Sequence, residues 1–489
     1  MKYCKIYFCC TNLINKSIFK VYYYMICDNG LPFINKYVDK LNDILKLNNK
    51  KLTFRQLCWI KFILLGIIVT NTVCWSKIER FSLGNYSLNA ISWMFRHSKI
   101  FWNNLLTASV TNLIKLYNIT DCVLAIDDTD KSRSKNIKRI GMAHKIKDKK
   151  TSGYFMGQNI VKLLLISNGV SLPVGFRLYE PDPNLKKYKL ELARLRKKKV
   201  PKIYWPKEVR RDSSLYKTKI ELAIELLKEF TKNHNSVRIN AIIADALYGS
   251  NYFVSEAKLI SKQVITEVKS TQNIIVNNKT IQLAKFFAQY FGITTNLKLR
   301  YNNRLVNYVA CKFKLKSHNE KRYVIAVKFD NEDSYRYIIA TDMSWQATDI
   351  IQTFSLRWLI EVFIQDWKSY EGWGSMAKQP GVDGSIRGII LSLLCDHALL
   401  SHDEQIALFK KREPACTVGS LCEKVKIDSL LEFIKTIVNS DSPHELFNQY
   451  HIQINQFFKL KQSNKHIRNN NYPPQIYCTK NNMDILKVA

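Results

Sequence analysis

Paired cysteines are what this sequence most clearly lacks. Its twelve cysteines are scattered over 489 residues, and no two of them form a C-x-x-C pair. Zinc ribbons and secreted disulfide scaffolds both depend on regular cysteine spacing. The cysteine pattern therefore argues against both classes and favours a protein of the reducing cytoplasm.

A secretion signal and a membrane span are also missing from the pattern. The segment Met1 to Phe8 has no sustained hydrophobic stretch followed by a small-residue cleavage site. The apolar run from Leu57 to Trp75 is interrupted by Lys61 and diluted by Thr70 and its neighbours, so it is shorter than a span needs. We therefore expect a buried helix there, no secretion and no membrane partner.

Acidic residues are scarce compared with basic ones. The chain has 75 Lys and Arg against 40 Asp and Glu, a formal net charge of +35. Such an excess indicates a polyanionic partner, and nucleic acid is the obvious candidate. A general bias toward Lys explains part of the excess but not its clustering, because twelve basic residues and two glutamates lie between Lys186 and Arg211.

Two short apolar runs each lead directly into a carboxylate. Val123 to Ile126 precede Asp127 and Asp128, and Ala241 to Ala244 precede Asp245. Runs of this length and composition are typical of buried central strands. The sequence therefore predicts two strands that end in acidic residues.

A third acidic residue lies in a segment with helical spacing. At 100° per residue, Phe354, Arg357, Glu361, Ile364 and Lys368 share one arc of a helix whose other sides are mostly apolar. Taken alone, Arg357 and Glu361 are explained as well by an ordinary i, i+4 ion pair. Together with the two strand-end acids, however, Glu361 would complete a set of oxygen ligands for a divalent cation such as Mg²⁺.

Hydrophobic periodicity predicts further elements on either side of these acids. Expected helices are Phe33–Leu47, Leu57–Val73 and Ile91–Trp102 (with a helix start at Ser87), Tyr216–Asn233, Ile386–Leu400 and Ser429–Ile437. Expected strands are Gln158–Ile166 and Ser171–Tyr179, joined by a turn at Asn168-Gly169, then Gln263–Val268, Leu297–Tyr301, Tyr308–Lys314, Tyr323–Phe329 and Tyr335–Thr341. The tail from Lys459 is rich in Asn and Lys and has little to bury.

This element order predicts an α/β protein with a ribonuclease H-like mixed sheet and helices on both faces. A β-rich insertion would interrupt the sheet, and helical regions would flank it. The expected division is a helical, DNA-binding N-terminal domain at 1–115, the first part of the catalytic core at 116–269, the insertion at 270–343, the end of the core at 344–400, and a helical C-terminal region with a basic tail at 401–489.

The motifs around the three acids resemble those of bacterial insertion-sequence transposases of the DDE superfamily that carry a Y-x2-R-x3-E-x6-K signature. The resemblance covers roughly residues 120 to 400. Matching pieces are Leu124 to Thr129 for the first aspartate motif, Ala244 to Gly249 for the second, and Arg357, Glu361 and Lys368 for the signature.

The resemblance implies cut-and-paste transposition at the inverted-repeat ends of an insertion sequence by a homodimer bound to double-stranded DNA. It implies that Asp127, Asp245 and Glu361 hold two Mg²⁺ ions, for which Mn²⁺ can substitute. It further implies that Arg357 and Lys368 grip phosphates. A flipped base would stack on an aromatic residue of the insertion, such as Tyr337 or Trp345. The implied location is the bacterial cytoplasm, at the nucleoid.

Two positions depart from the family pattern or leave it open. Phe354 stands where the signature has a tyrosine, so any phosphate hydrogen bond from that hydroxyl is lost. The first catalytic aspartate is either Asp127, favoured by the Asp-x-Thr pattern and by register with Asp245, or Asp128. The aspartate that does not bind metal would order the loop or contact the residues that bind it.

Further assignments and two alternative functions stay open. His144 and Gln158 would contact DNA or only order a loop, and Lys217 and Lys219 would face the DNA or simply the solvent. The chain could instead be a catalytically inert, transposase-derived DNA-binding protein, which the presence of all three acids argues against. It could also be a ribonuclease H-like nuclease without strand transfer, which would use the same ligands.

Overall fold

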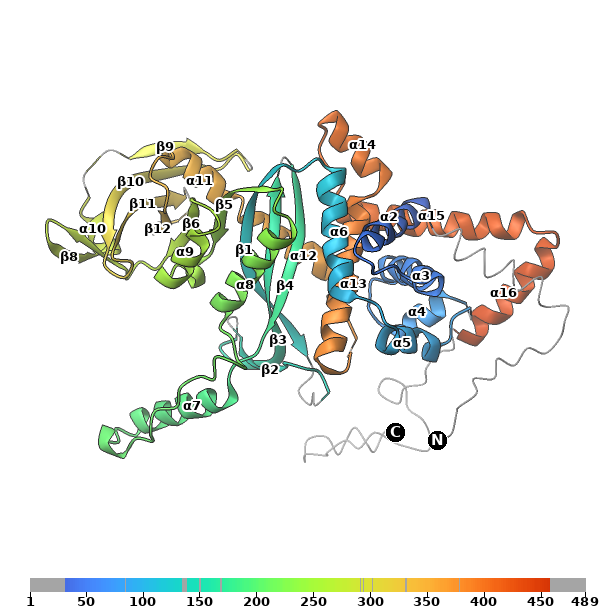
Figure 1. Ribbon diagram of the computed structural model, residues 1–489, viewed down its shortest axis with the longest axis horizontal. Coiled ribbons are helices and arrows are strands. Elements are labelled where there is room, and N and C mark those ends of the chain that lie inside the picture. The colour runs from blue at the N-terminus through green and yellow to red at the C-terminus, as the bar shows by residue number, and fades with distance from the viewer. Residues whose placement is uncertain are drawn as a thin grey trace, which may run out of the picture.

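The computed structural model of the chain describes residues 31–457, apart from residues 84, 134–138, 149–150, 168, 291, 293, 301, 330–331 and 378. It is a mixed α/β structure in which a group of helices, a long sheet and a strand-rich part follow one another along the longest axis (Figure 1). The expectations for Met1 to Phe8, for Asn168 and for the tail from Lys459 lie outside the described residues.

The N-terminal part is helical, as the periodicity predicts. Its helices are α2 (Pro32–Leu47), α3 (Phe54–Thr70), α4 (Trp75–Phe81), α5 (Leu88–His97) and α6 (Trp102–Leu116). Ser87 is the N-cap of α5 and accepts a hydrogen bond from the Ala90 N–H, which confirms the expected helix start. The expected single helix from Ile91 to Trp102 is wrong, because residues 98–101 separate α5 from α6.

Helix α3 confirms the buried helix expected from the long apolar run. A capping box fixes its start, since Thr53 accepts from the Gln56 N–H and the Gln56 side chain accepts from the Thr53 N–H. Most of its apolar residues are fully buried in the main core. In the part of the chain that the structure describes, no single helix is both long and apolar enough to cross a membrane.

The strands of the described residues join into one sheet of twelve. The strands are β1 (Asp121–Arg133), β2 (His144–Lys147), β3 (Tyr154–Ser167), β4 (Val170–Tyr179), β5 (Arg238–Ala244), β6 (Val264–Val268), β7 (Asn273–Val276), β8 (Lys279–Gln282), β9 (Thr295–Lys298), β10 (Leu305–Leu315), β11 (Glu320–Phe329) and β12 (Arg336–Ala340). The order is β2-β3-β1-β5-β6-β12-β11-β10-β7-β8, with β4 beside β3 and β9 beside β10. Only the β1–β5 and β5–β6 pairs are parallel among these described strands.

Two features of this sheet differ from the expectation. Strand β1 does not end at Asp127 but continues to Arg133, because its polar second half pairs with β3 as far as Met156. The strand-rich insertion also does not form a sheet of its own. Strand β12 pairs with β6, so the insertion extends the sheet that carries the acids.

Helices cover both faces of the sheet and create two cores. On one face lie α11 (Ala347–Ser355), α12 (Trp358–Tyr370) and α13 (Gly381–Leu400), over a core that includes Ala125, Ile243 and Ile265. On the other lie α8 (Lys219–Asn233) and α9 (Asn251–Lys258), over a core that includes Ile126 and Ala244. Neighbouring residues of β1 and β5 thus point to opposite faces, as strand geometry requires.

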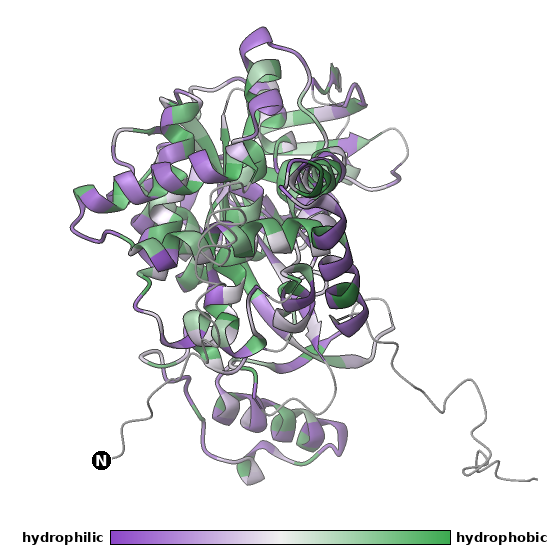
Figure 2. Ribbon diagram, turned by 90° about the vertical axis from the view of Figure 1, so that its right-hand side faces the viewer, coloured by the Kyte–Doolittle hydropathy of each residue, from purple (hydrophilic) through white to green (hydrophobic). Residues whose placement is uncertain are grey.

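The remaining helices lie outside these layers. They are α7 (Pro183–Lys197), α10 (Leu283–Ala288), α14 (Asp403–Lys411), α15 (Val418–Val438) and α16 (Pro443–Phe457). Helix α7 projects from the body below the sheet, whereas α15 and α16 extend at the end formed by α2 to α5 (Figure 1). Figure 2, which views that end, shows hydrophobic and hydrophilic residues interleaved along its helices.

Candidate active site

Three carboxylates stand in a row across the three parallel strands. Ile126 lies opposite Ala244 in β5, and Ala244 lies opposite Thr266 in β6. The next residues at this level are Asp127, Asp245 and Glu267, and their side chains share one face because facing residues of adjacent strands point the same way. Asp127 and Asp245 are close enough to interact. Burial raises the pKa of Asp127 to about 6, and the Asp245 carboxylate adds to that rise.

Arg357 connects this row to Glu361. Its guanidinium donates to Asp127 Oδ2 over 3.2 Å and to Glu361 Oε1 over 2.6 Å. Both Arg357 and Asp127 are largely buried, with exposed side-chain fractions of 17% and 15%. One cation therefore compensates two carboxylates, the largely buried Asp127 and the more exposed Glu361.

A turn at Leu356 and Arg357 interrupts the helical segment that carries Glu361. Phe354 lies in α11 and Glu361 in α12, and the turn between them is held by short-range bonds such as Arg357 N–H to Phe354 O and Ile360 N–H to Arg357 O. The expected single helix from Phe354 to Lys368 is therefore wrong. The tightened turn still keeps Arg357 and Glu361 near each other.

Asp128 points to the opposite face of β1 from Asp127. Its Oδ2 accepts from Lys219 Nζ of α8 over 2.6 Å, and the pair lies on the side of the second core. Asp127 thus shares a face with Asp245 and Glu361, whereas Asp128 does not. The geometry favours Asp127 as the first aspartate of the site.

Lys368 and a cavity continue the site along α12. The Lys368 ammonium donates to Thr129 Oγ1 over 2.7 Å, two residues beyond Asp127 on the same face. Beside Arg357, a cavity of about 160 Å³ lies between the insertion and α11–α12. The residues that line it include Phe354, Trp358, Phe329, Arg304 and Arg336.

The cavity contains two arginines packed on one aromatic ring. The guanidinium groups of Arg304 and Arg336 lie 5.0 and 5.1 Å from the centroid of the Phe329 ring. Tyr337, by contrast, is only 5% exposed, and its ring packs on Phe287 at 5.6 Å. Tyr337 therefore points into the insertion, and the rings that reach the cavity are Phe329, Phe354 and Trp358.

Other residues singled out in the sequence have local partners. Gln158 is fully buried, accepts from Arg133 and donates to the Gly141 carbonyl over 2.8 Å, so it orders a loop. His144 Nδ1 lies 3.0 Å from the Met142 carbonyl. Lys217 forms an ion pair with Glu225, and Trp345 lies at another pocket, away from Arg357.

Two charged residues near the site were missed in the sequence. Glu267 is half-buried, and its pKa is raised by burial, while Arg336 and Arg357 oppose the rise. Its signal was weaker than that of the other two acids, because only Val264 and Ile265 are apolar before Thr266 and Glu267. Lys162 faces Asp127 across the β1–β3 pair, is buried under α12, and its Nζ lies 3.3 Å from the Trp367 ring centroid. Burial lowers the pKa of Lys162 well below its usual value.

The oxygen-rich row suits a hard divalent cation, but Arg357 occupies part of the space it would need. Among the described residues, no three acidic, histidine or cysteine side chains lie close enough together to hold an ion as they stand. The candidate ligands are Asp127, Asp245, Glu361 and Glu267. Their donor chemistry fits Mg²⁺, and a bound cation would oppose the rise in the pKa of Asp127 that burial and the Asp245 carboxylate cause.

Comparison with known families supports a class of DNA-processing enzymes. Residues 196–399 match the model of a family of DDE transposases, described as "Archaeal putative transposase ISC1217". The match includes Asp245, Glu267, the insertion and Glu361, but it begins at residue 196 and so does not include Asp127. The match covers less than half of the chain and shows a similarity to DDE transposases in this part. The family's description is archaeal, so the match does not extend to the bacterial origin or to the exact signature expected from the sequence.

The other comparisons add little. No curated protein matches the chain. Among solved structures, the NurA nuclease from Sulfolobus solfataricus aligns over 52% of this chain and 83% of its own, at 7% identity and a TM-score of 0.25. A likeness this weak carries no argument about fold or activity.

Proposed function

We propose that this chain is a DNA transposase that cleaves and joins DNA by metal-dependent phosphoryl transfer at the inverted-repeat ends of an insertion sequence. The observation that carries the proposal is the shared face of Asp127, Asp245 and Glu361, the last tied to the first through Arg357. The transposase family match supports it independently. The parallel strands β1, β5 and β6, with helices on both faces, are compatible with a ribonuclease H-like core.

In this proposal the carboxylates hold Mg²⁺ or Mn²⁺ and Glu267 supplies a fourth acidic group. The two bound ions would supply the activation of a water or 3′ hydroxyl and the stabilisation of the leaving oxygen. Arg357 would turn from Asp127 and Glu361 to a phosphate of the DNA, which frees both carboxylates. Lys368 would hold a neighbouring phosphate, and the cavity with Phe329, Phe354 and Trp358 would receive an unstacked base.

The test is Mg²⁺-dependent nicking of a duplex that carries the DNA flanking the gene. We expect Glu361→Gln to reduce nicking at least 100-fold, because the ions that stabilise the transition-state charge would lose a ligand. DNA binding should stay within about twofold of wild type. Glu423→Gln on α15 is the matched control. Equal nicking by wild type and Glu361→Gln would end the proposal.

Products of the same assay distinguish strand transfer from hydrolysis. A transposase joins the released 3′ end to a second DNA, whereas a nuclease yields only free ends. Release of free ends without any joined product, in the presence of target DNA, would favour the nuclease. An inert protein would bind the DNA without forming either product.

A further inference from the structure

A basic arm projects from the body beside the proposed active site. It comprises residues 183–210, between β4 and α8, and consists of α7 and a return segment with the short helix η1 (Lys202–Tyr204). Helix α7 has 15 residues, which corresponds to a length of about 22 Å. Figure 1 shows α7 well away from the other helices. Within 183–210, all of which the structure describes, no side chain is buried.

The arm carries far more positive charge than it can neutralise. Eleven Lys and Arg stand against two Glu in 183–210, a net charge of +9. Within these described residues, a single ion pair forms inside the arm, between Arg194 and Glu191 at 3.5 Å. The return segment is held to α7 by packing of Arg196 on the Trp205 ring at 5.3 Å and by a bond from Trp205 Nε1 to the Val200 carbonyl. A segment that repels itself yet keeps a defined shape is suited to bind a polyanion.

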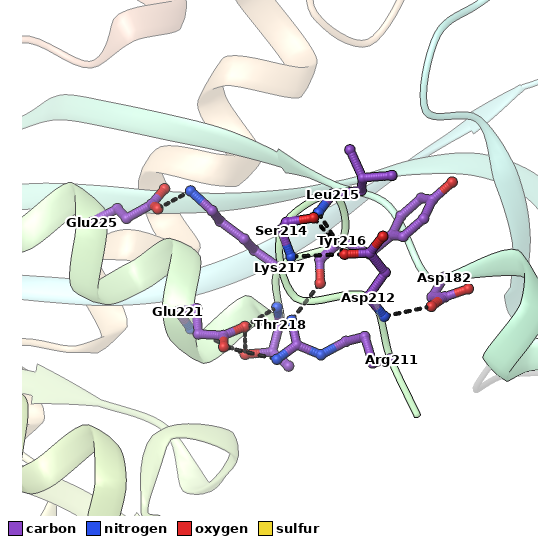
Figure 3. A network of polar contacts seen from close by, with 10 residues as sticks. All are labelled: Asp182, Arg211, Asp212, Ser214, Leu215, Tyr216, Lys217, Thr218, Glu221 and Glu225. Atoms are coloured by element: carbon purple, nitrogen blue, oxygen red, sulfur yellow. Dashed lines mark hydrogen bonds and ion pairs between the residues drawn. The ribbon is translucent and has the colours of Figure 1, made fainter. Parts of the chain in front are cut away.

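A network of acidic residues fixes the base of the arm (Figure 3). Asp182 caps α7 by accepting from the N–H groups of Asn184 and Leu185, and its other oxygen accepts from the Asp212 N–H over 3.0 Å. The two ends of the arm are thereby joined. Arg211 adds a bidentate ion pair with Glu221, both bonds 2.8 Å long.

The same network continues into α8. Thr218 and Glu221 form a capping box at the start of that helix, and Lys217 pairs with Glu225. Charges at the base are therefore compensated within the protein, whereas the cations of the arm are not. Figure 3 shows Glu221 beside Arg211, Glu225 beside Lys217, and Asp182 beside Asp212.

The arm leaves and re-enters the fold next to the proposed site. Strand β4 is antiparallel to β3, which is antiparallel to β1, so β4 and β1 end at the same edge of the sheet. Lys219, at the start of α8, contacts both the ring of Tyr179 at the end of β4 (5.6 Å) and Asp128 (2.6 Å), on the face of the sheet opposite Asp127. DNA that extends from Asp127 and Asp245 past this edge of the sheet would reach the arm.

We propose that the basic arm binds the phosphate backbone of the duplex that flanks the scissile bond, independently of base sequence. The proposal rests on the proposed function, because it takes its DNA from the same site. A helix of about 22 Å would follow roughly six base pairs, at about 3.4 Å each. The exposed lysines of α7 and the residue after it, Lys187, Lys189, Lys197 and Lys198, are the expected phosphate contacts.

The test measures the affinity of the full chain for 30-base-pair duplexes of arbitrary sequence as a function of salt concentration. The arm variant changes Lys187, Lys189, Lys197 and Lys198 to Gln, which keeps helix propensity and removes four charges. The control makes the same change at exposed lysines elsewhere, Lys279, Lys321, Lys410 and Lys411. A second variant replaces 184–210 by a short Gly-Ser linker, which the adjacent ends at Asp182 and Asp212 allow.

We expect the slope of log affinity against log salt to fall by roughly two to four in the arm variant and by less than one in the control. The excised variant should show the same loss, keep the melting temperature of the wild type, and protect about six fewer base pairs in a footprint. An unchanged slope in both arm variants would overturn the proposal. A change in oligomeric state with unchanged DNA affinity would also overturn it, because the arm would then bind a second copy of the chain.

The nicking assay separates this result from the proposed function. If wild type nicks DNA and arm excision leaves the salt slope unaltered, the arm proposal fails and the enzyme proposal stands. If excision weakens DNA binding but wild type never nicks, the arm proposal stands and the enzyme proposal fails.

Discussion

Arg357 has the strongest influence on the site, because it neutralises the carboxylates that the proposed function needs to bind metal ions. In the present arrangement its guanidinium holds Asp127 and Glu361 together. A phosphate offers the same planar, bidentate partner as a carboxylate. DNA binding and metal binding would therefore assist each other, since DNA removes Arg357 from the oxygens that the ions require.

Arg357→Ala tests this competition without DNA. We expect the variant to bind Mn²⁺ about tenfold more tightly than wild type, because Asp127, Asp245 and Glu361 lose their internal cation. Titration calorimetry or the electron paramagnetic resonance signal of free Mn²⁺ would measure this affinity. Arg304→Ala, which also removes a cavity arginine but contacts none of the candidate ligands, is the control. Equal Mn²⁺ affinity in wild type and Arg357→Ala would contradict the competition.

Glu267 is the second residue that decides how the site works. If it contributes to cation binding, Glu267→Gln should raise the Mg²⁺ concentration for half-maximal nicking about tenfold and leave DNA affinity unchanged. Glu320→Gln, on the far part of the insertion, provides a matched neutralisation. An identical Mg²⁺ dependence in Glu267→Gln and wild type would assign Glu267 a purely structural place in the row.

At the scale of elements, a buried hydrogen-bonded chain ties three helices to the sheet. Tyr37 of α2 lies 2.5 Å from Ser109 of α6, Ser109 Oγ lies 2.6 Å from His397 Nδ1 of α13, and His397 Nε2 donates to the Pro173 carbonyl of β4 over 2.8 Å. The contact with a carbonyl requires a proton on Nε2, so Nδ1 accepts from Ser109. Burial lowers the pKa of His397 to about 4.

The buried, uncharged His397 in this hydrogen-bonded network predicts that the protein loses stability on acidification. Between pH about 6.5 and 4 the unfolded chain binds a proton at His397 and the folded chain does not, so the free energy of unfolding falls as pH falls. The loss attributable to His397 is at most about 3 kcal/mol. Denaturant unfolding of wild type and His397→Gln over this range measures it. The difference between the two proteins should depend on pH; a constant difference would show that His397 does not cause the loss.

Sequence patterns predicted the elements whose signals are local. The N-cap at Ser87, the apolar strand before Asp245 and the buried helix α3 were all readable, because capping and burial leave a mark within a few residues. Strand β1 beyond Asp127 was not, since its polar residues are held as strand by pairing with distant β3. Helix α7 was also missed, although Asp182-Pro183 is a helix-start signal.

The candidate site was predictable as a set of acids but not as a geometry. Asp127, Asp245 and Glu361 could be named from apolar runs and helical spacing. That Asp128 turns to Lys219, that Arg357 sits between two carboxylates, and that Glu267 joins the row all depend on strand register and on tertiary contacts. The contacts of Asp128 with Lys219 and of Arg357 with Asp127 join residues 91 and 230 positions apart, beyond the range of any local pattern.

At the scale of the whole molecule, one side of helix α15 is apolar and open to solvent. Ile427, Leu430, Leu431, Ile434 and Val438 follow the i, i+3, i+4, i+7, i+11 spacing of a single stripe and are 46 to 64% exposed. The opposite side, with Leu421, Cys422 and Val425, is buried. An exposed stripe of this kind favours a helical partner. A second copy of the chain is the occupant implied by the predicted homodimer.

Leu430→Glu tests this assembly. We expect the variant to remain monomeric at concentrations and on end DNA where wild type forms a dimer, with the melting temperature of the monomer within about 2 °C of wild type. Sedimentation of the free and DNA-bound protein measures it. Glu432→Gln, on the same helix but outside the stripe, is the control. A dimer that forms equally well with Leu430→Glu would place the interface elsewhere.

The pairing of β12 with β6 places a constraint on how this chain can vary. A chimera that receives a foreign insertion must end it with a strand that aligns with β6 as Ile339 now aligns with Thr266. Without that strand, β6 would become an exposed edge strand, and its unpaired amide and carbonyl groups would promote aggregation. Grafts that preserve this register should express as soluble protein, and grafts that shift it by one residue should precipitate, since a one-residue slip turns every side chain to the wrong face.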